Sequence, residues 1–109
     1  MDLDSTKQQL RKGLLEYALL LMLSQKEAYV GDMMRGLAAT EFATQEGTLY
    51  PLLSRLRRES HISHRWVESA GGPPRKYYSL TESGEAHLAA LKDYWKELDE
   101  TLSALGGAL

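Results

Sequence analysis

In the first third of the chain, hydrophobic residues recur among polar ones with the 3.6-residue period of an amphipathic helix. This pattern predicts a helix over residues 10–23 whose second half is buried. A shorter helix is predicted over residues 28–37. The apolar positions behind these two predictions are Leu10, Leu14, Tyr17 and Leu21 in the first helix and Met33, Met34 and Leu37 in the second.

A third helix is predicted over residues 45–59, where leucines recur at i, i+3, i+4 and i+7 and mark one core face. The core positions are Leu49, Leu52, Leu53 and Leu56, and the positions opposite them are Gly47, Pro51, Ser54 and Arg58. Because a proline has no N–H to donate, we expect the start of this helix to be kinked or loosely wound.

The second half of the chain predicts a hairpin followed by a long helix. Residues 62–69 and 75–80 have the composition of strands, and Gly71-Gly72-Pro73-Pro74 between them is a strong turn signal. Thr81 can cap a helix that ends at Gly106-Gly107. This helix carries a heptad seam, which is typical of a surface that packs against another helix, formed by Leu88, Leu91, Trp95, Leu98, Leu102 and Leu105.

The predicted fold is mainly α (α+β). Three helices, a hairpin and a long fourth helix are the order of a winged helix-turn-helix with a two-stranded wing and a C-terminal dimerisation helix. We expect residues 1–81 to form the winged helix-turn-helix domain and residues 82–109 the dimerisation helix. A length of 109 residues fits one domain, so the two parts should form one compact unit.

The net charge of −2 gives no sign of a polyanionic partner, but the charges are segregated along the chain. Residues 55–76 carry a net charge of +4, residues 82–100 carry −4 and residues 1–54 carry −2. A basic block of this kind can attract phosphate locally. On charge alone, however, an ordinary solvated surface is the favoured interpretation.

Several function classes are excluded by the sequence. There is no cysteine, and the three histidines lack the spacing of a metal site, so we expect no metal and no cofactor. No nucleotide-binding or nucleophile motif is present, so we expect no enzyme. The longest apolar run has seven residues, against about 20 for a membrane span, so the sequence predicts a soluble, cytoplasmic protein.

Candidate DNA-binding residues fall in two places. The third helix has short polar groups, phenols and long cationic donors outside its core face, as a helix in the major groove requires. The hairpin tip combines small residues with cations, as a wing lying along phosphates requires. The candidates are Thr48, Tyr50, Ser54, Arg55, Arg57 and Arg58 on the helix and Gly71, Gly72, Pro73, Pro74, Arg75 and Lys76 on the wing.

Two segments resemble the PadR family of bacterial transcriptional regulators. Residues 46–56 (EGTLYPLLSRL) resemble its recognition helix, and residues 71–84 (GGPPRKYYSLTESG) resemble its wing. The resemblance covers roughly residues 10–105 and implies a homodimer that binds a palindromic operator and usually represses. Two departures are Gly31, where the family usually has an aromatic residue, and Ser60-His61, which replace a Gly-Leu pair and make the helix cap less ideal.

The resemblance also implies roles for single residues. Thr48 and Tyr50 would meet phosphates, Ser54, Arg55 and Arg58 would lie toward the groove, and Lys76 would grip the DNA backbone. Gly72 and Arg75 complete the predicted DNA-binding set. Tyr78 and Leu80 are expected to pack inward, with Tyr77 facing outward or supporting the wing. The predicted dimer interface is Leu88, Leu91, Trp95, Leu98 and Leu102.

Trp95 is open to two interpretations. It is either packing within the dimer seam or, as in multidrug-sensing members of the family, a platform that binds a planar aromatic effector together with Asp99. The matching face of the first helix is expected to carry Gln9, Lys12 and Glu16, and a Lys12–Glu16 pair would close the space. An alternative for the whole chain is a winged-helix protein-interaction module that does not bind DNA.

Overall fold

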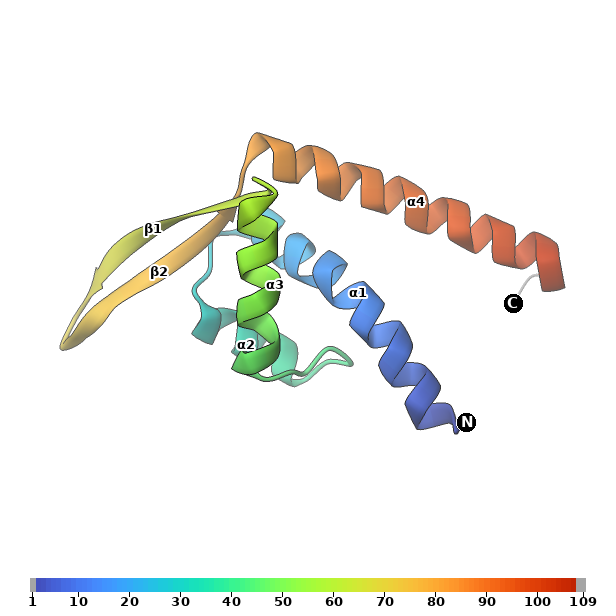
Figure 1. Ribbon diagram of the computed structural model, residues 1–109, viewed down its shortest axis with the longest axis horizontal. Coiled ribbons are helices and arrows are strands. Elements are labelled where there is room, and N and C mark those ends of the chain that lie inside the picture. The colour runs from blue at the N-terminus through green and yellow to red at the C-terminus, as the bar shows by residue number, and fades with distance from the viewer. Residues whose placement is uncertain (1, 108–109) are drawn as a thin grey trace.

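The computed structural model describes residues 2–107 and has the predicted mainly α architecture with a two-stranded antiparallel wing (Figure 1). The helices α1, α2 and α3 lie together, the wing projects from one side of them and α4 extends from the other (Figure 1). The elements in chain order are α1 (Leu3–Gln25), α2 (Val30–Ala38), α3 (Glu46–Arg58), β1 (Ile62–Ser69), β2 (Gly72–Leu80) and α4 (Glu82–Gly106).

Helix α1 begins at Leu3, seven residues earlier than predicted. The Asp2 carboxylate accepts a hydrogen bond of 2.7 Å from the backbone N–H of Ser5, which makes Asp2 the N-cap. The first turns are polar and exposed, so hydrophobic periodicity alone did not reveal them. The capping residue was the signal that could have placed the true start.

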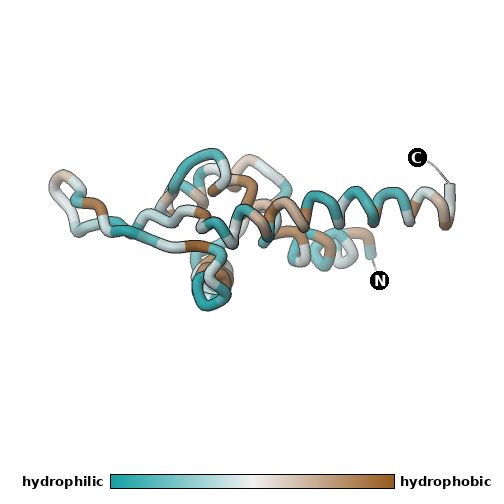
Figure 2. Tube along the Cα trace, turned by 90° about the horizontal axis from the view of Figure 1, so that it is seen from above, coloured by the Kyte–Doolittle hydropathy of each residue, from teal (hydrophilic) through white to brown (hydrophobic). Residues whose placement is uncertain are grey.

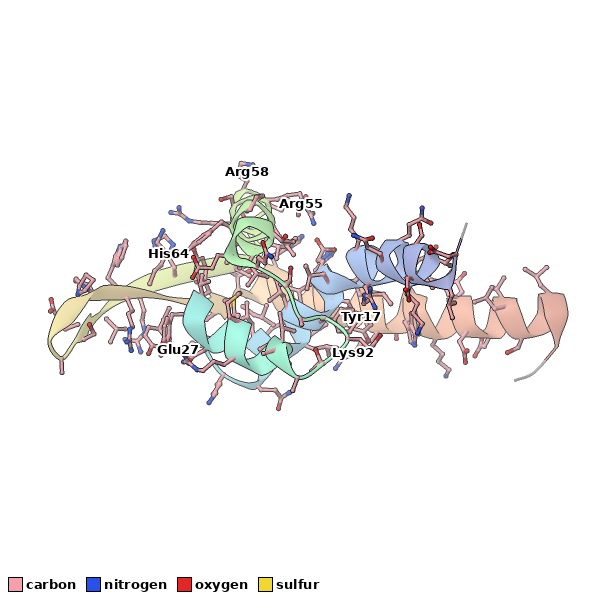
Figure 3. The ribbon with its side chains drawn as sticks, turned by 90° about the horizontal axis from the view of Figure 1, so that it is seen from below. Tyr17, Glu27, Arg55, Arg58, His64 and Lys92 are labelled. Carbon is pink, nitrogen blue, oxygen red and sulfur yellow. The ribbon has the colours of Figure 1, made fainter. Side chains whose placement is uncertain are left out.

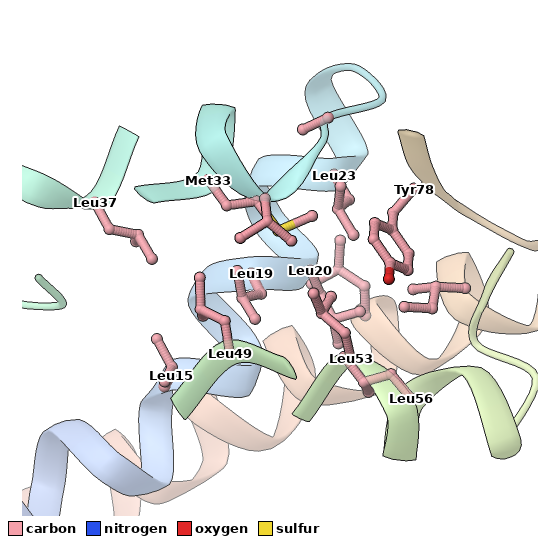
Figure 4. Packing of buried hydrophobic residues seen from close by; sticks show 14 residues of the cluster. Leu15, Leu19, Leu20, Leu23, Met33, Leu37, Leu49, Leu53, Leu56 and Tyr78 are labelled. Carbon is pink, nitrogen blue, oxygen red and sulfur yellow. The ribbon is translucent and has the colours of Figure 1, made fainter. Parts of the chain in front are cut away.

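The hydrophobic core lies where α1, α2, α3 and the base of the wing meet (Figure 4). The leucine face predicted for α3 is confirmed, because Leu49, Leu53 and Leu56 are buried. The second half of α1 is buried as predicted, but the stripe that revealed the helix is not its core face, since Leu10 and Leu21 are exposed. The buried residues of α1 are Leu15, Leu19, Leu20 and Leu23.

Helix α3 runs unbroken from Glu46 to Arg58 with Pro51 inside it, so the expected loosely wound start is not seen. Its C-terminus is closed by backbone hydrogen bonds from Ser60 to the carbonyl of Arg57 and from His61 to the carbonyl of Leu56. Ser60 occupies the left-handed position of this motif with φ 66°. The less ideal cap expected from the Ser60-His61 pair is therefore present.

Replacing Ser60 with glycine should stabilise the fold, because a side chain at positive φ is strained whereas glycine is not. Glycine loses more backbone entropy on folding, which offsets part of the gain, so we expect a net stabilisation of about 0.5–1 kcal/mol. Thermal unfolding followed by circular dichroism measures it. An unchanged or lower midpoint would show that Ser60 is not strained.

The wing is longer than predicted. Strand β2 begins at Gly72 rather than at residue 75, and the turn consists of Ala70 and Gly71, with φ 74° at the glycine. The two prolines lie in an irregularity of the register, between the pairs Val67–Arg75 and Ser69–Gly72. Proline has no N–H for a ladder hydrogen bond and is tolerated at such a bulge.

The base of the wing is fastened to the segment before α2. Ala28 forms a bridge with Tyr78 through two backbone hydrogen bonds of 3.0 and 2.8 Å. Arg65 of β1 forms an ion pair with Glu27 beside this bridge. Tyr78 is buried as predicted, so the root of the wing is part of the core.

Helix α4 starts against the core and then leaves it. Thr81 caps the helix as predicted, since its hydroxyl accepts a 2.9 Å hydrogen bond from the Gly84 N–H. Leu88 is only 5% exposed and packs in the core, so it is not available for the dimer interface predicted for it, and the exposed part of the seam begins after it. Leu91 is half-buried against the core, and hydrophobic residues recur from there to the far end of the helix (Figure 2).

Candidate nucleic-acid interface

The outer face of α3 carries a short polar group and two arginines. Ser54 and Arg58 are exposed on the side opposite the leucine face, and Arg57 is exposed beside them. Figure 3 shows Arg58 at the outer edge of the helix. None of these three side chains has an ion pair within residues 2–107, so their hydrogen-bonding capacity is available to a ligand.

The Arg55 side chain lies on a different side of α3. Its guanidinium is 2.6 Å from the carboxylate of Glu16 on α1 and 3.1 Å from that of Glu59, and it sits on the side of α3 nearer α1 (Figure 3). In this structure Arg55 therefore points toward α1, a position that does not favour its predicted place in the groove. Thr48 is also on the α1 side, where it lines a hollow of about 420 Å³ with residues of α1.

The wing presents one face to α3. Strand alternation places Trp66 and Lys76 opposite each other on that face, with the Lys76 Nζ 5.1 Å from the Trp66 ring centroid. Trp66 is 62% exposed, which is unusual for a tryptophan that serves only packing. His64 lies on the same face, and loss of solvation lowers its pKa, as do the nearby charges of Arg57 and Lys76.

The other face of the wing contacts the start of α2. The Arg75 guanidinium lies over the Tyr29 ring at 4.5 Å, and the Tyr77 ring lies 5.3 Å from that of Tyr29. The prediction that Tyr77 supports the wing is confirmed. Arg75 is exposed and leans on Tyr29, on the opposite face of the strand from Lys76, although it lines one hollow together with Lys76 and Trp66.

The recognition face and the wing enclose one concave surface. A hollow of about 390 Å³ is lined by Ser54, Arg57, Arg58 and Lys76, with Leu53 and Tyr78 at its floor. We call this surface the α3–wing face. A neighbouring hollow of about 320 Å³ adds Tyr50 and Trp66. Three cations beside exposed aromatic rings can bind a sugar–phosphate backbone.

The structure thus brings together part of the predicted set. Ser54, Arg58 and Lys76 share the α3–wing face, whereas Thr48 and Arg55 lie on the opposite side of α3. Gly72 lies at the wing tip. Arg57 was a candidate on the third helix but was left out of the predicted DNA-binding set. Trp66 was missed as a site residue, although its position in a strand opposite Lys76 could have indicated it.

A second, apolar surface lies along α1 and α4. Trp95 is 49% exposed and lines a small hollow of about 200 Å³ whose other walls are entirely apolar. The expected polar wall is wrong, because Glu16 pairs with Arg55 rather than with Lys12. The walls of the hollow besides Trp95 are Leu14, Tyr17, Ala18, Leu21 and Phe42.

Neither metal ligation nor membrane insertion is indicated by residues 2–107. No three potential ligands from His, Asp or Glu side chains come together in this part of the chain. None of its helices combines the length and the apolar character that crossing a bilayer requires.

Comparison with known proteins shows the same architecture. Residues 19–90 match the transcriptional regulator PadR-like family. A PadR-like transcription factor from Bacteroides fragilis is 47% identical, with 94% of this chain and 99% of that chain covered and a TM-score of 0.81. A PadR family transcriptional regulator from Eggerthella lenta is 30% identical, with 94% and 89% covered and a TM-score of 0.85.

A third structure contains a ligand. Bacillus subtilis PadR in complex with operator DNA is 25% identical, with 72% of this chain and 46% of that chain covered and a TM-score of 0.64. The family match spans more than half of this chain, and the expected winged-helix fold is confirmed by the solved structures. The chain therefore belongs to the PadR-like family of transcriptional regulators and is not an enzyme.

Proposed function

We propose that this protein is a homodimeric repressor that binds a palindromic DNA operator through the α3–wing face. The observation that carries the proposal is the convergence of Arg57, Arg58 and Lys76, three unpaired cations from two elements, on one concave surface. An α-helix fits the major groove, and a cationic wing follows the adjacent backbone. The operator complex of Bacillus subtilis PadR supports this assignment.

The residues divide by role. Ser54 and Arg58 project from the exposed side of α3 and are placed to meet base edges in the major groove. Lys76 and Trp66 lie on the wing, where a cation and an exposed ring fit phosphate and sugar. Tyr50, which is 50% exposed between them, donates its hydroxyl to phosphate.

The dimer is proposed from the exposed apolar stripe of α4. Trp95, Leu102 and Leu105 are 49%, 65% and 80% exposed, and together with Leu98 they continue the heptad seam beyond the core. A stripe of this length on a soluble domain marks an interaction surface. A second copy of the chain fits it because each copy supplies the same apolar repeat. Two recognition helices per dimer then match the two halves of a palindrome.

Replacing Arg58 or Lys76 with alanine should weaken operator binding about tenfold, because each removes a charged contact worth about 1–3 kcal/mol. Arg58 is exposed, Lys76 is half-buried, and neither forms an ion pair within residues 2–107, so the thermal midpoint should change little. Fluorescence anisotropy with a labelled duplex from the chain's own promoter, repeated at several salt concentrations, measures this. Lys96→Ala on α4 is the matched control.

Two outcomes of that titration speak against the proposal. Wild-type protein that binds no duplex, or binds with no dependence on salt, would favour a protein-interaction module instead. Variants of Arg58 and Lys76 that unfold while the Lys96 control does not would show that these residues stabilise the fold rather than contact DNA.

The apolar hollow beside Trp95 is proposed to bind a planar aromatic effector that releases the operator. Asp99, exposed one turn further along α4, is proposed as a second contact although it does not line the hollow. Such a ring would stack on Trp95 and change its emission. We expect saturable quenching by planar cationic dyes in a Trp66→Tyr background, where Trp95 is the remaining tryptophan. A flat titration, or quenching that persists in Trp95→Phe with Trp66 retained, would leave Trp95 as packing.

A further inference from the structure

Polar side chains from three helices meet on the side of α3 that faces away from the wing. Glu16 of α1 is central, because one carboxylate oxygen is 2.6 Å from Arg55 of α3 and the other is 3.8 Å from the imidazole of His87 on α4. The carboxylate of Glu59, at the end of α3, lies 3.1 Å from the Arg55 guanidinium. We call these four residues the Glu16 junction.

The junction is not a loose surface ion pair. The Glu16 side chain is 21% exposed, and it joins Arg55 across 39 positions of sequence. The hydrogen bond to Glu16 raises the pKa of Arg55. A guanidinium held by two carboxylates has little freedom to turn, because its planar donors are fixed in direction.

The junction continues into the turn that joins α3 to β1. His87 stacks on His61 with ring centroids 4.1 Å apart and planes 3° apart, and the His61 Nδ1 is 3.0 Å from the Ser83 hydroxyl. His61 lies two residues after Glu59, the C-cap of α3, whereas Ser83 and His87 lie in the first turns of α4. The recognition helix is therefore tied at its C-terminal end to the two helices that carry the apolar surface.

We propose that Glu16 and Arg55 are positioning residues that set the angle of the recognition helix relative to α1 and α4. This inference rests on the proposed operator binding and dimer. The distance between two recognition helices must match the half-site spacing of the DNA, so a small tilt of α3 at the junction misplaces both helices at once. Arg55 then acts through Glu16 without touching DNA.

Two other roles for Glu16 and Arg55 predict different results. If Glu16 merely competed with phosphate for Arg55, removing the carboxylate would free a cation and strengthen DNA binding. If Arg55 touched phosphate, removing it would lower the slope of log K against log salt by about 1, as expected for one lost phosphate contact. A positioning residue weakens binding without changing that slope.

The test compares Glu16→Gln, Arg55→Gln and the double variant in operator binding over a range of salt. We expect each single variant to weaken binding about tenfold, within the range of coupled contacts, with the salt slope of the wild type. The double variant should bind no more weakly than either single one, because both remove the same link. Lys76→Gln, by comparison, should lower the slope by about 1, because Lys76 is proposed to contact phosphate.

Glu41→Gln is the matched control, because it removes a carboxylate that pairs with Arg11 of α1 and lies outside the Glu16 junction; binding should be unchanged. Circular dichroism and sedimentation check that each variant is folded and dimeric. If Arg55→Gln unfolds, Arg55→Lys replaces it: positioning predicts weaker binding at unchanged slope, and a phosphate contact predicts nearly unchanged binding.

The inference is overturned if Glu16→Gln binds more tightly, if Arg55→Gln lowers the salt slope, or if neither variant changes binding. Wild-type protein that binds no duplex would instead refute the proposed function, and the inference with it. The two failures are thus distinguished by the wild-type titration.

Discussion

Replacing Leu98 with glutamate is expected to convert the dimer to monomer and weaken operator binding by about 100-fold or more. Leu98 lies on the stripe of α4 that leaves the core, between the exposed Trp95 and Leu102. A charge buried in an apolar helix interface has no partner and is strongly unfavourable. Once the subunits separate, each binds a half-site alone and loses the gain of about 10²–10⁴ that linkage provides.

The control for this prediction is Ala104→Glu, which places the same charge on the opposite side of α4, where residue 104 is exposed. Sedimentation velocity measures the oligomeric state, and anisotropy measures operator affinity. A Leu98→Glu protein that still sediments as a dimer would refute the heptad interface. A monomer that keeps full operator affinity would refute the role of the dimer in DNA binding.

Replacing Gly84 with alanine is expected to destabilise the protein by about 3 kcal/mol. A Cβ at this position would lie 1.9 Å from the carbonyl oxygen of His61, which is backbone and already accepts a hydrogen bond from Thr81. This clash can be relieved only if the first turn of α4 moves away from the turn that follows α3. The midpoint of thermal unfolding should therefore fall by roughly 10 °C or more.

Gly13→Ala is the matched control, since Gly13 lies inside α1 and a Cβ there meets no atom within 4 Å. Alanine is the better helix former by about 1 kcal/mol, so this variant should be more stable than the wild type. Melts are compared at one protein concentration, because the proposed dimer would make the midpoint depend on concentration. A Gly84→Ala protein with an unchanged midpoint would show that the close approach is not required.

Most of the fold was predictable from the sequence because each element carries a local signal. The leucine spacing of α3, the turn residues of the wing and the capping Thr81 all act within a few residues. The errors came from features without such a signal. The polar start of α1 depends on a cap at Asp2, and β2 extends through two prolines that a bulge accommodates.

The site was less predictable because it depends on contacts between distant segments. Arg55 and Arg58 look equivalent in the sequence and both are exposed, yet Glu16 holds Arg55 on the α1 side of α3 while Arg58 forms no ion pair within residues 2–107. Nothing near Arg55 in the sequence shows a carboxylate 39 positions away. The exposed Trp66 similarly acquires its place beside Lys76 only through the strand register.

The central claim is that a symmetric dimer of this PadR-like protein reads DNA with its α3–wing face. Selection of bound duplexes from a random pool, followed by sequencing, tests it most directly. The account predicts enrichment of a two-fold symmetric sequence whose half-sites are separated by about 10 base pairs or a multiple of that, so that both recognition helices meet one side of the duplex. A pool that shows no enrichment, or enriches only single asymmetric sites, would contradict it.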